Sequence, residues 1–264
     1  MTTIADHPDY ASDAWDDLSF WSSHFGALLF DHLELRPNVV GLDVACGSGF
    51  PLFELVHAHG PGSHFTGVDI WPDAIERATR KLAVYELDNV VLLEGDAAQL
   101  PFPDQHFDLI TSNLGINNFD DPPRAMAECF RVAKGGARVV VTTNLTGHMA
   151  PFYDLFRTTL RESGREDLVP ALDAQEAHRG TTETIEALLE NAGFEVTRLI
   201  HGQFFLRYAN GTAMLNHPLV GFFKDGWMGV TRDTAIWRTV EEKLNAASPL
   251  QMPVPMLYAE GVRR

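Results

Sequence analysis

A carboxylate followed by alternating small residues is the first pattern in this sequence that could do chemistry. It lies in and after the apolar run 39–44, where Asp43 is followed by Ala45, Gly47 and Gly49. When a strand turns into a helix over glycines, backbone N–H groups and the positive end of the helix face a ligand. The segment therefore predicts a site for the carboxylate or phosphate group of a cofactor.

The glycine turn differs from two common nucleotide fingerprints. The dinucleotide pattern G-x-G-x-x-G needs a third glycine where this chain has Leu52, and a phosphate loop needs a Gly-Lys-Ser/Thr that is absent. A second carboxylate, Asp69, lies near the end of the run 64–70, and a carboxylate at a strand tip can accept hydrogen bonds from both hydroxyls of a ribose. These two patterns suit NAD as well as an adenosyl cofactor and leave both open.

The pattern Asp43-x-Ala45-x-Gly47-x-Gly49 resembles the first motif of class I S-adenosylmethionine (SAM)-dependent methyltransferases. Ala45 stands where glycine is commonest in that family. The resemblance extends over residues 36–146 and implies SAM as cofactor and S-adenosylhomocysteine as product. The cofactor-binding residues that it implies are Asp43, Ala45, Gly47, Gly49, Asp69, Ile70, Trp71, Asp96, Ala97 and Asn113.

The pair Asp96 and Ala97, just after the run 90–94, separates the two cofactors. In the family, the acidic residue after the third strand accepts a hydrogen bond from the adenine amino group, and the next backbone N–H reaches the ring. Dinucleotide enzymes have no fixed acidic residue and alanine at this place, so the resemblance favours SAM. An NAD(P)-dependent oxidoreductase and a non-catalytic SAM-binding module are the alternatives.

Trp71 is unusual for its position. Relatives have a small polar residue there, which is also what a helix N-cap prefers, and a tryptophan side chain cannot cap. We expect its ring either to lie against the adenosine or to pack on the surface.

The acceptor side is less specified. The segments Leu114-Gly-Ile-Asn-Asn and Leu100-Pro-Phe-Pro-Asp resemble those of ubiquinone/menaquinone C-methyltransferases, and Asn113 would meet the methionine end of SAM. The asparagines of the first segment either orient an acceptor or form a turn. The aromatic candidates either line an acceptor site or belong to the core. The arginine candidate either binds an acceptor carboxylate or forms a surface ion pair. The candidate substrate-binding residues are Trp15, Phe20, Asn117, Asn118, Phe152, Tyr153, Arg207 and His217.

His148 is the candidate general base, because it follows the fifth apolar run, at the edge of the sheet where open α/β sheets bind ligands. A base is needed only if the acceptor must lose a proton, and the alternative is a loop histidine with no catalytic role. We expect no metal site, since no His-Glu-x-x-His is present and Asn113 stands where a metal-binding relative would have a carboxylate. Arsenite methyltransferases rely on several cysteines, whereas this chain has only Cys46 and Cys129.

Alternating apolar runs and helical patterns must position these residues. This alternation predicts a doubly wound, Rossmann-like α/β sheet, and the resemblance implies seven mostly parallel strands with an antiparallel edge strand. Pro72 fits the first position of one helix, and a second helix is capped by Asp121, opened by Pro122 and closed by Gly135. The expected core strands are residues 39–44, 64–70, 90–94, 107–112 and 137–142.

We expect a single methyltransferase domain. An N-terminal helical cap (residues 1–35, with a helix over 14–34) would precede the SAM-binding core of residues 36–146. Acceptor-side inserts would occupy residues 147–180 and 209–250, and residues 251–264 would form a last edge strand. The further elements expected are helices at about 152–162, 182–192 and within 212–248, and strands at 194–200 and 204–208.

Charge and composition exclude several other classes of protein. Twenty basic and 36 acidic residues give a net charge of −16, which disfavours binding to nucleic-acid phosphates. Two cysteines cannot build a disulfide scaffold, and no signal peptide or apolar membrane span is visible. We therefore expect a cytoplasmic enzyme, monomeric or homodimeric, that acts on a small-molecule acceptor.

Overall fold

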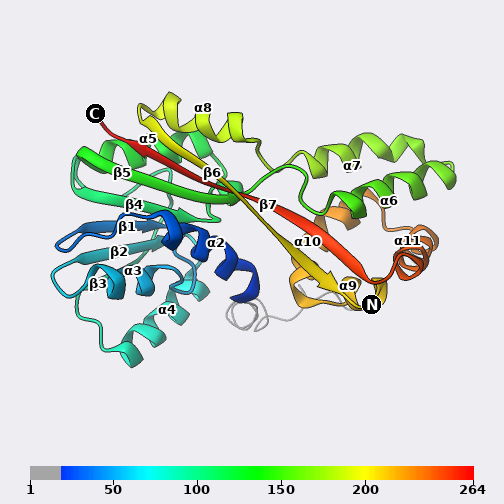
Figure 1. The fold of residues 1–264 in the computed structure, drawn as a ribbon, viewed down its shortest axis with the longest axis horizontal. Coiled ribbons are helices and arrows are strands. Elements are labelled where there is room, and N and C mark those ends of the chain that lie inside the picture. The colour runs from blue at the N-terminus through cyan, green and yellow to red at the C-terminus, as the bar shows by residue number, and fades with distance from the viewer. Residues whose placement is uncertain (1–18) are drawn as a thin grey trace. The chain divides into compact units, whose positions relative to one another are not determined.

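A computed structural model describes residues 19–264 of the chain (Figure 1). The described residues fall into two compact units. The sheet unit contains residues 19–143, 181–202 and 256–264, and the helical unit contains residues 144–180 and 203–255. The single domain expected from the sequence stays a prediction.

The fold is built on a seven-stranded sheet with the strand order β3-β2-β1-β4-β5-β7-β6. Neighbours among the first five strands of this order pair in parallel, as the alternating pattern predicts. The strands are β1 (Val40–Val44), β2 (His64–Asp69), β3 (Val90–Glu94), β4 (Phe107–Asn113), β5 (Ala133–Asn144), β6 (Glu195–Tyr208) and β7 (Leu250–Val262).

The central strands are buried because their residues are almost continuously apolar. Asp43 is the exception in β1, and it stands opposite Gly67 of β2 and Thr111 of β4. The parallel register thus brings the carboxyl ends of these strands to one edge of the sheet, where the candidate cofactor residues follow.

Strand β7 gives the sheet its antiparallel part. The backbone N–H of Gly136 donates to the carbonyl of Arg263, whose own N–H donates to the carbonyl of Ala137, so β7 runs opposite to β5. The predicted fold class is therefore confirmed: a mostly parallel sheet with antiparallel pairing at one edge. The prediction that residues 251–264 form the edge strand was wrong, because β7 lies between β5 and β6 and β6 is the outermost strand.

Three helices of the sheet unit start at the predicted residues, Pro72, Pro122 and Thr182, and the second of them ends earlier than predicted. Asp121 caps α5 by accepting from the N–H of Arg124, but the helix stops at Val132 rather than at Gly135. Ala133 already pairs with Phe107 of β4, so long-range strand pairing overrides the local glycine signal. The helices are α2 (Ser19–His32), α3 (Leu52–His59), α4 (Pro72–Tyr85), η2 (Ile116–Asn118), α5 (Pro122–Val132) and α8 (Thr182–Ala192). In Figure 1, α5 and α8 lie together near β5 and β6, whereas α3 and α4 lie near β2 and β3.

The helical unit has an aromatic core of its own. The rings of Phe152 and Trp227 stack with centroids 4.0 Å apart, and Tyr153 accepts a hydrogen bond from the indole N–H of Trp227. The segment expected to be helical within 212–248 forms three helices, and the two strands expected at 194–200 and 204–208 form the single strand β6. The helices of this unit are α6 (Ala150–Glu162), η3 (Glu166–Leu168), α7 (Val169–Glu176), α9 (Gly211–Leu215), α10 (Pro218–Val230) and α11 (Thr234–Ala246). Within residues 19–264, no helix has the length and apolar character needed to cross a bilayer.

Candidate functional site

The glycine turn after β1 has an unusual backbone. Ala45, Gly47 and Gly49 all have positive φ angles, of 60°, 55° and 102°. A Cβ atom on Gly47 would meet nothing within 4 Å, whereas one on Gly49 would collide with the ring of Phe53. Gly49 is thus required by packing, and Gly47 leaves open space beside its Cα atom. Ala45 adopts a left-handed conformation that costs an alanine roughly 1–2 kcal/mol.

Asp43 is a buried carboxyl group with an unmet hydrogen-bonding capacity. Its Oδ1 accepts a 2.7 Å hydrogen bond from the hydroxyl of Thr111. Its Oδ2 has no hydrogen-bond partner within the described part of the chain. Burial raises the pKa of Asp43 to about 7, while the Thr111 hydrogen bond lowers it and the charge of Asp69 raises it further. A buried acceptor without a hydrogen-bond partner is unfavourable, so Oδ2 of Asp43 is a candidate acceptor for a ligand's hydrogen-bond donor or cation.

Asp69 joins the tip of β2 to the glycine turn. Its Oδ2 accepts a 2.8 Å hydrogen bond from the N–H of Gly47, and its Oδ1 accepts a 2.9 Å hydrogen bond from the N–H of Trp71. Trp71 occupies the N-cap position of α4 without a side-chain cap bond, and its ring is half-buried. Ile70 is 64% exposed. Both possible roles of the Trp71 ring stay open.

The tip of β3 lies next to that of β2. The N–H of Gly95 donates to the carbonyl of Asp69, and the two residues after Gly95 are Asp96 and Ala97. The exposed carboxylate of Asp96 accepts from the N–H of Ala98, which forms a tight turn, while Ala97 is buried. The three predicted acidic residues, at 43, 69 and 96, therefore lie at or just after the carboxyl ends of the neighbouring strands β1, β2 and β3.

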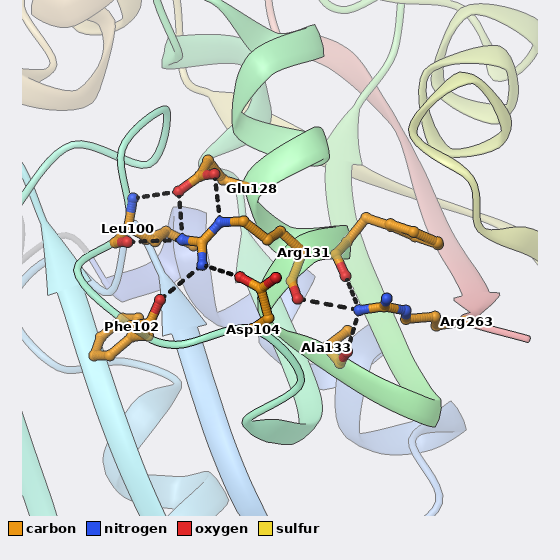
Figure 2. Close-up of polar contacts among 8 residues, drawn as sticks. Leu100, Phe102, Asp104, Glu128, Arg131, Ala133 and Arg263 are labelled. Atoms are coloured by element: carbon orange, nitrogen blue, oxygen red, sulfur yellow. Dashed lines mark hydrogen bonds and ion pairs between the residues drawn. The ribbon is translucent and has the colours of Figure 1, made fainter.

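A charged clamp from α5 holds the segment that follows this third tip. Figure 2 shows the guanidinium of Arg131 donating to Glu128, Asp104 and the carbonyls of Leu100 and Phe102, at distances of 2.7–2.9 Å. Glu128 also accepts from the N–H of Leu100. The hydrogen bond from Arg131 is the main cause that lowers the pKa of Glu128. Segment and helix are thus fixed to each other by paired charges.

Two further arginines, Arg124 and Arg263, donate hydrogen bonds near the Arg131 clamp. Arg124 donates to the carbonyl of Ala98, and positions 124, 128 and 131 share one face of α5. Arg263 donates to the carbonyls of Arg131, Ala133 and Phe130, at the end of that helix (Figure 2). None of these residues was predicted as a site residue from the sequence. Their helical spacing was the available signal, but it does not say which segment the helix would hold.

At the end of β4, side-chain amides face β5. Oδ1 of Asn113 accepts a 2.7 Å hydrogen bond from the hydroxyl of Thr142, and Asn117 donates a 2.7 Å hydrogen bond to the hydroxyl of Thr143. Asn118 is exposed and donates to the carbonyl of Leu114, four residues earlier. Asn118 thus closes a local turn, whereas Asn113 and Asn117 are held by β5.

His148, the candidate base, lies in the helical unit. Its side chain is 4% exposed and packs against the ring of Phe223, with the centroids 5.0 Å apart. Burial lowers the pKa of His148 to about 3, and the charge of Arg179 lowers it further. The imidazole is therefore neutral at pH 7. Its role as a base stays a prediction.

The remaining substrate candidates are dispersed. Phe152 and Tyr153 are buried in the core of the helical unit, and Arg207 of β6 is exposed. His217 caps α10 by accepting a 3.2 Å hydrogen bond from the N–H of Leu219. In the sheet unit, Phe20 is 57% exposed on α2. Trp15 falls outside the described residues.

Comparisons with known proteins agree with this architecture. A family model described as a methyltransferase domain matches residues 35–193. Over 128 residues, 47% of the chain and 54% of the relative, it is 33% identical to a demethylmenaquinone methyltransferase of Listeria monocytogenes. Over 165 residues, 62% of the chain and 39% of the relative, it is 27% identical to an arsenite methyltransferase of Halobacterium salinarum. The chain thus spans about half or less of the length of these relatives.

A solved structure shares the fold over nearly the whole chain. The geranyl diphosphate C-methyltransferase of Streptomyces coelicolor superposes with a TM-score of 0.57 and 15% identity, covering 98% of this chain and 85% of its own. That structure contains Mg²⁺, geranyl diphosphate and S-adenosyl-L-homocysteine. At this level of identity the likeness concerns the fold.

Proposed function

Because the chain belongs to the methyltransferase domain family, we propose that it transfers a methyl group from SAM to a small-molecule acceptor. The observation that supports this most is the carboxylate of Asp69, which links the glycine turn to the tip of β2. A carboxylate in this position has the acceptor atoms that two ribose hydroxyls require. Family membership leaves the NAD(P)-dependent oxidoreductase without support.

The residues at this edge of the sheet fit SAM in two further respects. The buried Oδ2 of Asp43 lacks a hydrogen-bond donor among the described residues, and SAM carries an ammonium group and a sulfonium. Gly47 has open space beside its Cα atom, so a ligand can approach the backbone of the turn. The proposed cofactor-binding residues are Asp43, Ala45, Gly47, Gly49, Asp69, Ile70, Trp71, Asp96, Ala97 and Asn113.

In this proposal the protein acts mainly by positioning. SAM supplies a methyl group that its positive sulfur already activates for in-line displacement. Asp69 and Asp96 would orient the nucleoside, and the Arg131 clamp would keep the segment after Asp96 in place. Alignment of reacting groups can contribute up to roughly 7–11 kcal/mol to catalysis. His148 would remove a proton where the acceptor has one to lose, which requires that acceptor binding raises its pKa.

The acceptor atom, whether carbon, oxygen or nitrogen, stays open. The demethylmenaquinone methyltransferase among the relatives makes a quinone-like aromatic acceptor our first candidate. Arsenite is a weaker candidate, because Cys46 and Cys129 are both buried and burial raises the pKa of both thiols. The proposed acceptor-binding residues are Phe20, Asn117, Asn118, Phe152, Tyr153, Arg207 and His217.

Calorimetric titration with S-adenosylhomocysteine tests the cofactor, with NADH as the competing ligand. We expect S-adenosylhomocysteine to bind and NADH to give no heat. Incubation with methyl-labelled SAM and a panel of quinols, phenols and aromatic carboxylates then tests turnover. Cofactor binding without label transfer to any acceptor would favour the non-catalytic module, and absence of cofactor binding would overturn the proposal.

A further inference from the structure

Arg179 is a half-buried arginine of the helical unit that has no acidic partner among the described residues. Arg179 follows α7, and none of the described residues forms a hydrogen bond or an ion pair with its guanidinium. Arg157 of the same unit shows the usual arrangement, since its guanidinium binds Asp154, Asp173 and Glu176 at 2.6–2.8 Å. Glu176, three residues before Arg179, is thus engaged elsewhere.

The charge of Arg179 lies among aromatic rings. Its Cζ atom is 6.0 Å from the centroid of Phe223. Its positive charge adds to the burial that lowers the pKa of His148, and it opposes the burial that raises the pKa of Tyr153. The segment is fixed, because Thr146 donates its hydroxyl to the carbonyl of Arg179 and its N–H to the carbonyl of Gly180. The guanidinium is therefore held beside an apolar surface and near a neutral imidazole.

Such an arrangement is costly without a ligand. Burial lowers the pKa of Arg179, which shows that its charged form is partly deprived of water. In a chain with 36 acidic and 20 basic residues, carboxylates are abundant, yet none is placed here among the described residues. A partly buried charge without a partner is unfavourable, so a ligand that supplies the partner gains free energy of binding.

We propose that Arg179 binds the carboxylate of an aromatic methyl acceptor, whose ring packs near Phe223. That this ligand accepts a methyl group rests on the proposed function. A guanidinium presents parallel N–H donors that match the two oxygens of a carboxylate. One guanidinium balances a single negative charge, and a protein with a net charge of −16 disfavours a phosphate dianion. Arg207, for which both acceptor carboxylate binding and a surface ion pair were expected as alternatives, is exposed on β6.

Fluorine NMR with 4-fluorobenzoate and its uncharged analogue 4-fluorobenzamide tests the proposal. We expect the wild-type protein to bind the benzoate at least about tenfold more tightly than the benzamide, as a charge-assisted pair requires. Arg179→Met should abolish this preference, and Arg179→Lys should reduce it. Arg238→Met, which removes an exposed arginine of α11, should keep it.

Two further measurements separate the possible outcomes. Thermal unfolding should show that Arg179→Met is folded and no less stable than the wild type, with the benzoate raising the melting temperature of the wild type only. S-adenosylhomocysteine should bind the wild type and Arg179→Met equally. Failure of the wild type to bind it would count against the proposed function alone, whereas a loss confined to Arg179→Met would count against the carboxylate role of Arg179. The inference is overturned if the wild type does not prefer the benzoate, or if folded Arg179→Met keeps the preference.

Discussion

The N–H of Gly47 donates a 2.8 Å hydrogen bond to Oδ2 of Asp69, which ties the turn after β1 to the end of β2. The other oxygen of Asp69 accepts from the N–H of Trp71. One carboxylate thus braces the glycine turn and the start of α4. Each of its oxygens keeps a further lone pair, so Asp69 can position the backbone and still accept hydrogen bonds from a ligand.

Replacement of Asp69 should weaken cofactor binding. Asp69→Ala removes the charged acceptor for two ribose hydroxyls, so we expect S-adenosylhomocysteine to bind about 2–3 kcal/mol more weakly by calorimetry. Asp69→Asn loses the charge and keeps only one acceptor oxygen, so its amide NH2 would face the N–H of either Gly47 or Trp71. It should therefore unfold at a lower temperature than the wild type and bind the cofactor weakly.

Asp73→Ala is the matched control for this experiment, since Asp73 is an exposed carboxylate in the first turn of α4. It should leave the affinity for S-adenosylhomocysteine unchanged. A loss below about 0.5 kcal/mol in Asp69→Ala would remove the ribose role from this residue.

Local patterns predicted those parts of the fold that depend on neighbours in the sequence. The apolar run before Asp69 formed β2, Pro72 opened α4, and Asp121 capped α5. Gly135 misled because Ala133 pairs with Phe107 of β4, a contact that no local signal contains. The position of β7 between β5 and β6 depends likewise on long-range pairing.

The same distinction holds for the candidate site. The acidic residues at the strand tips lie in contiguous motifs, so the sequence could place them. The clamp of Arg131 requires α5 to approach Leu100 and Phe102, about thirty residues earlier, and that approach exists only in the folded chain. The burial of His148, and the absence of a partner for Arg179 among residues 19–264, are also properties of packing, which residue types alone do not give.

Asp43 should make the stability of the protein depend on pH. Burial raises its pKa to about 7 in the folded state, against about 3.9 for an unfolded chain. The folded protein holds this proton more tightly, so the stabilising contribution is complete below about pH 4 and is lost as the pH rises through about 7. Relative to Asp43→Asn, whose side chain stays neutral, the wild type should lose free energy of unfolding between about pH 4 and about pH 7.

Denaturant unfolding of both proteins across this range measures that difference. If the difference in free energy of unfolding between wild type and Asp43→Asn stays constant with pH, the pKa of Asp43 is not shifted by folding. If the wild type instead gains stability relative to Asp43→Asn as the pH rises, the pKa of Asp43 is lowered rather than raised.

Arg131 should act on the cofactor through the segment that it holds. Arg131→Met removes the five side-chain hydrogen bonds to residues 100–104 and Glu128. We expect faster hydrogen exchange at residues 98–104 and about tenfold weaker binding of S-adenosylhomocysteine, since the segment must then be ordered on binding. Arg131→Lys, which keeps the charge but not the planar fork, should recover part of both effects.

Arg80→Met controls for the loss of an arginine, because Arg80 forms an exposed ion pair with Glu76 within α4. It should change neither measurement. Faster exchange in Arg131→Met with undiminished cofactor affinity would reduce the clamp to a structural role.

His148 provides a test of whether proton removal takes part in the reaction. Since burial lowers its pKa to about 3 in the enzyme without acceptor, the imidazole is neutral there, and kcat/KM of the wild type should show no inflection near the ordinary histidine pKa of about 6.5. For an acceptor that must lose a proton, His148→Gln should lower kcat by about 10²-fold or more while the affinity for S-adenosylhomocysteine stays the same. His178→Gln, at an exposed histidine of the helical unit, is the control and should retain the wild-type rate. Thermal unfolding must show that His148→Gln is folded, because the side chain packs against Phe223. A folded variant with an unchanged rate across the pH range would show that this histidine only fills the core.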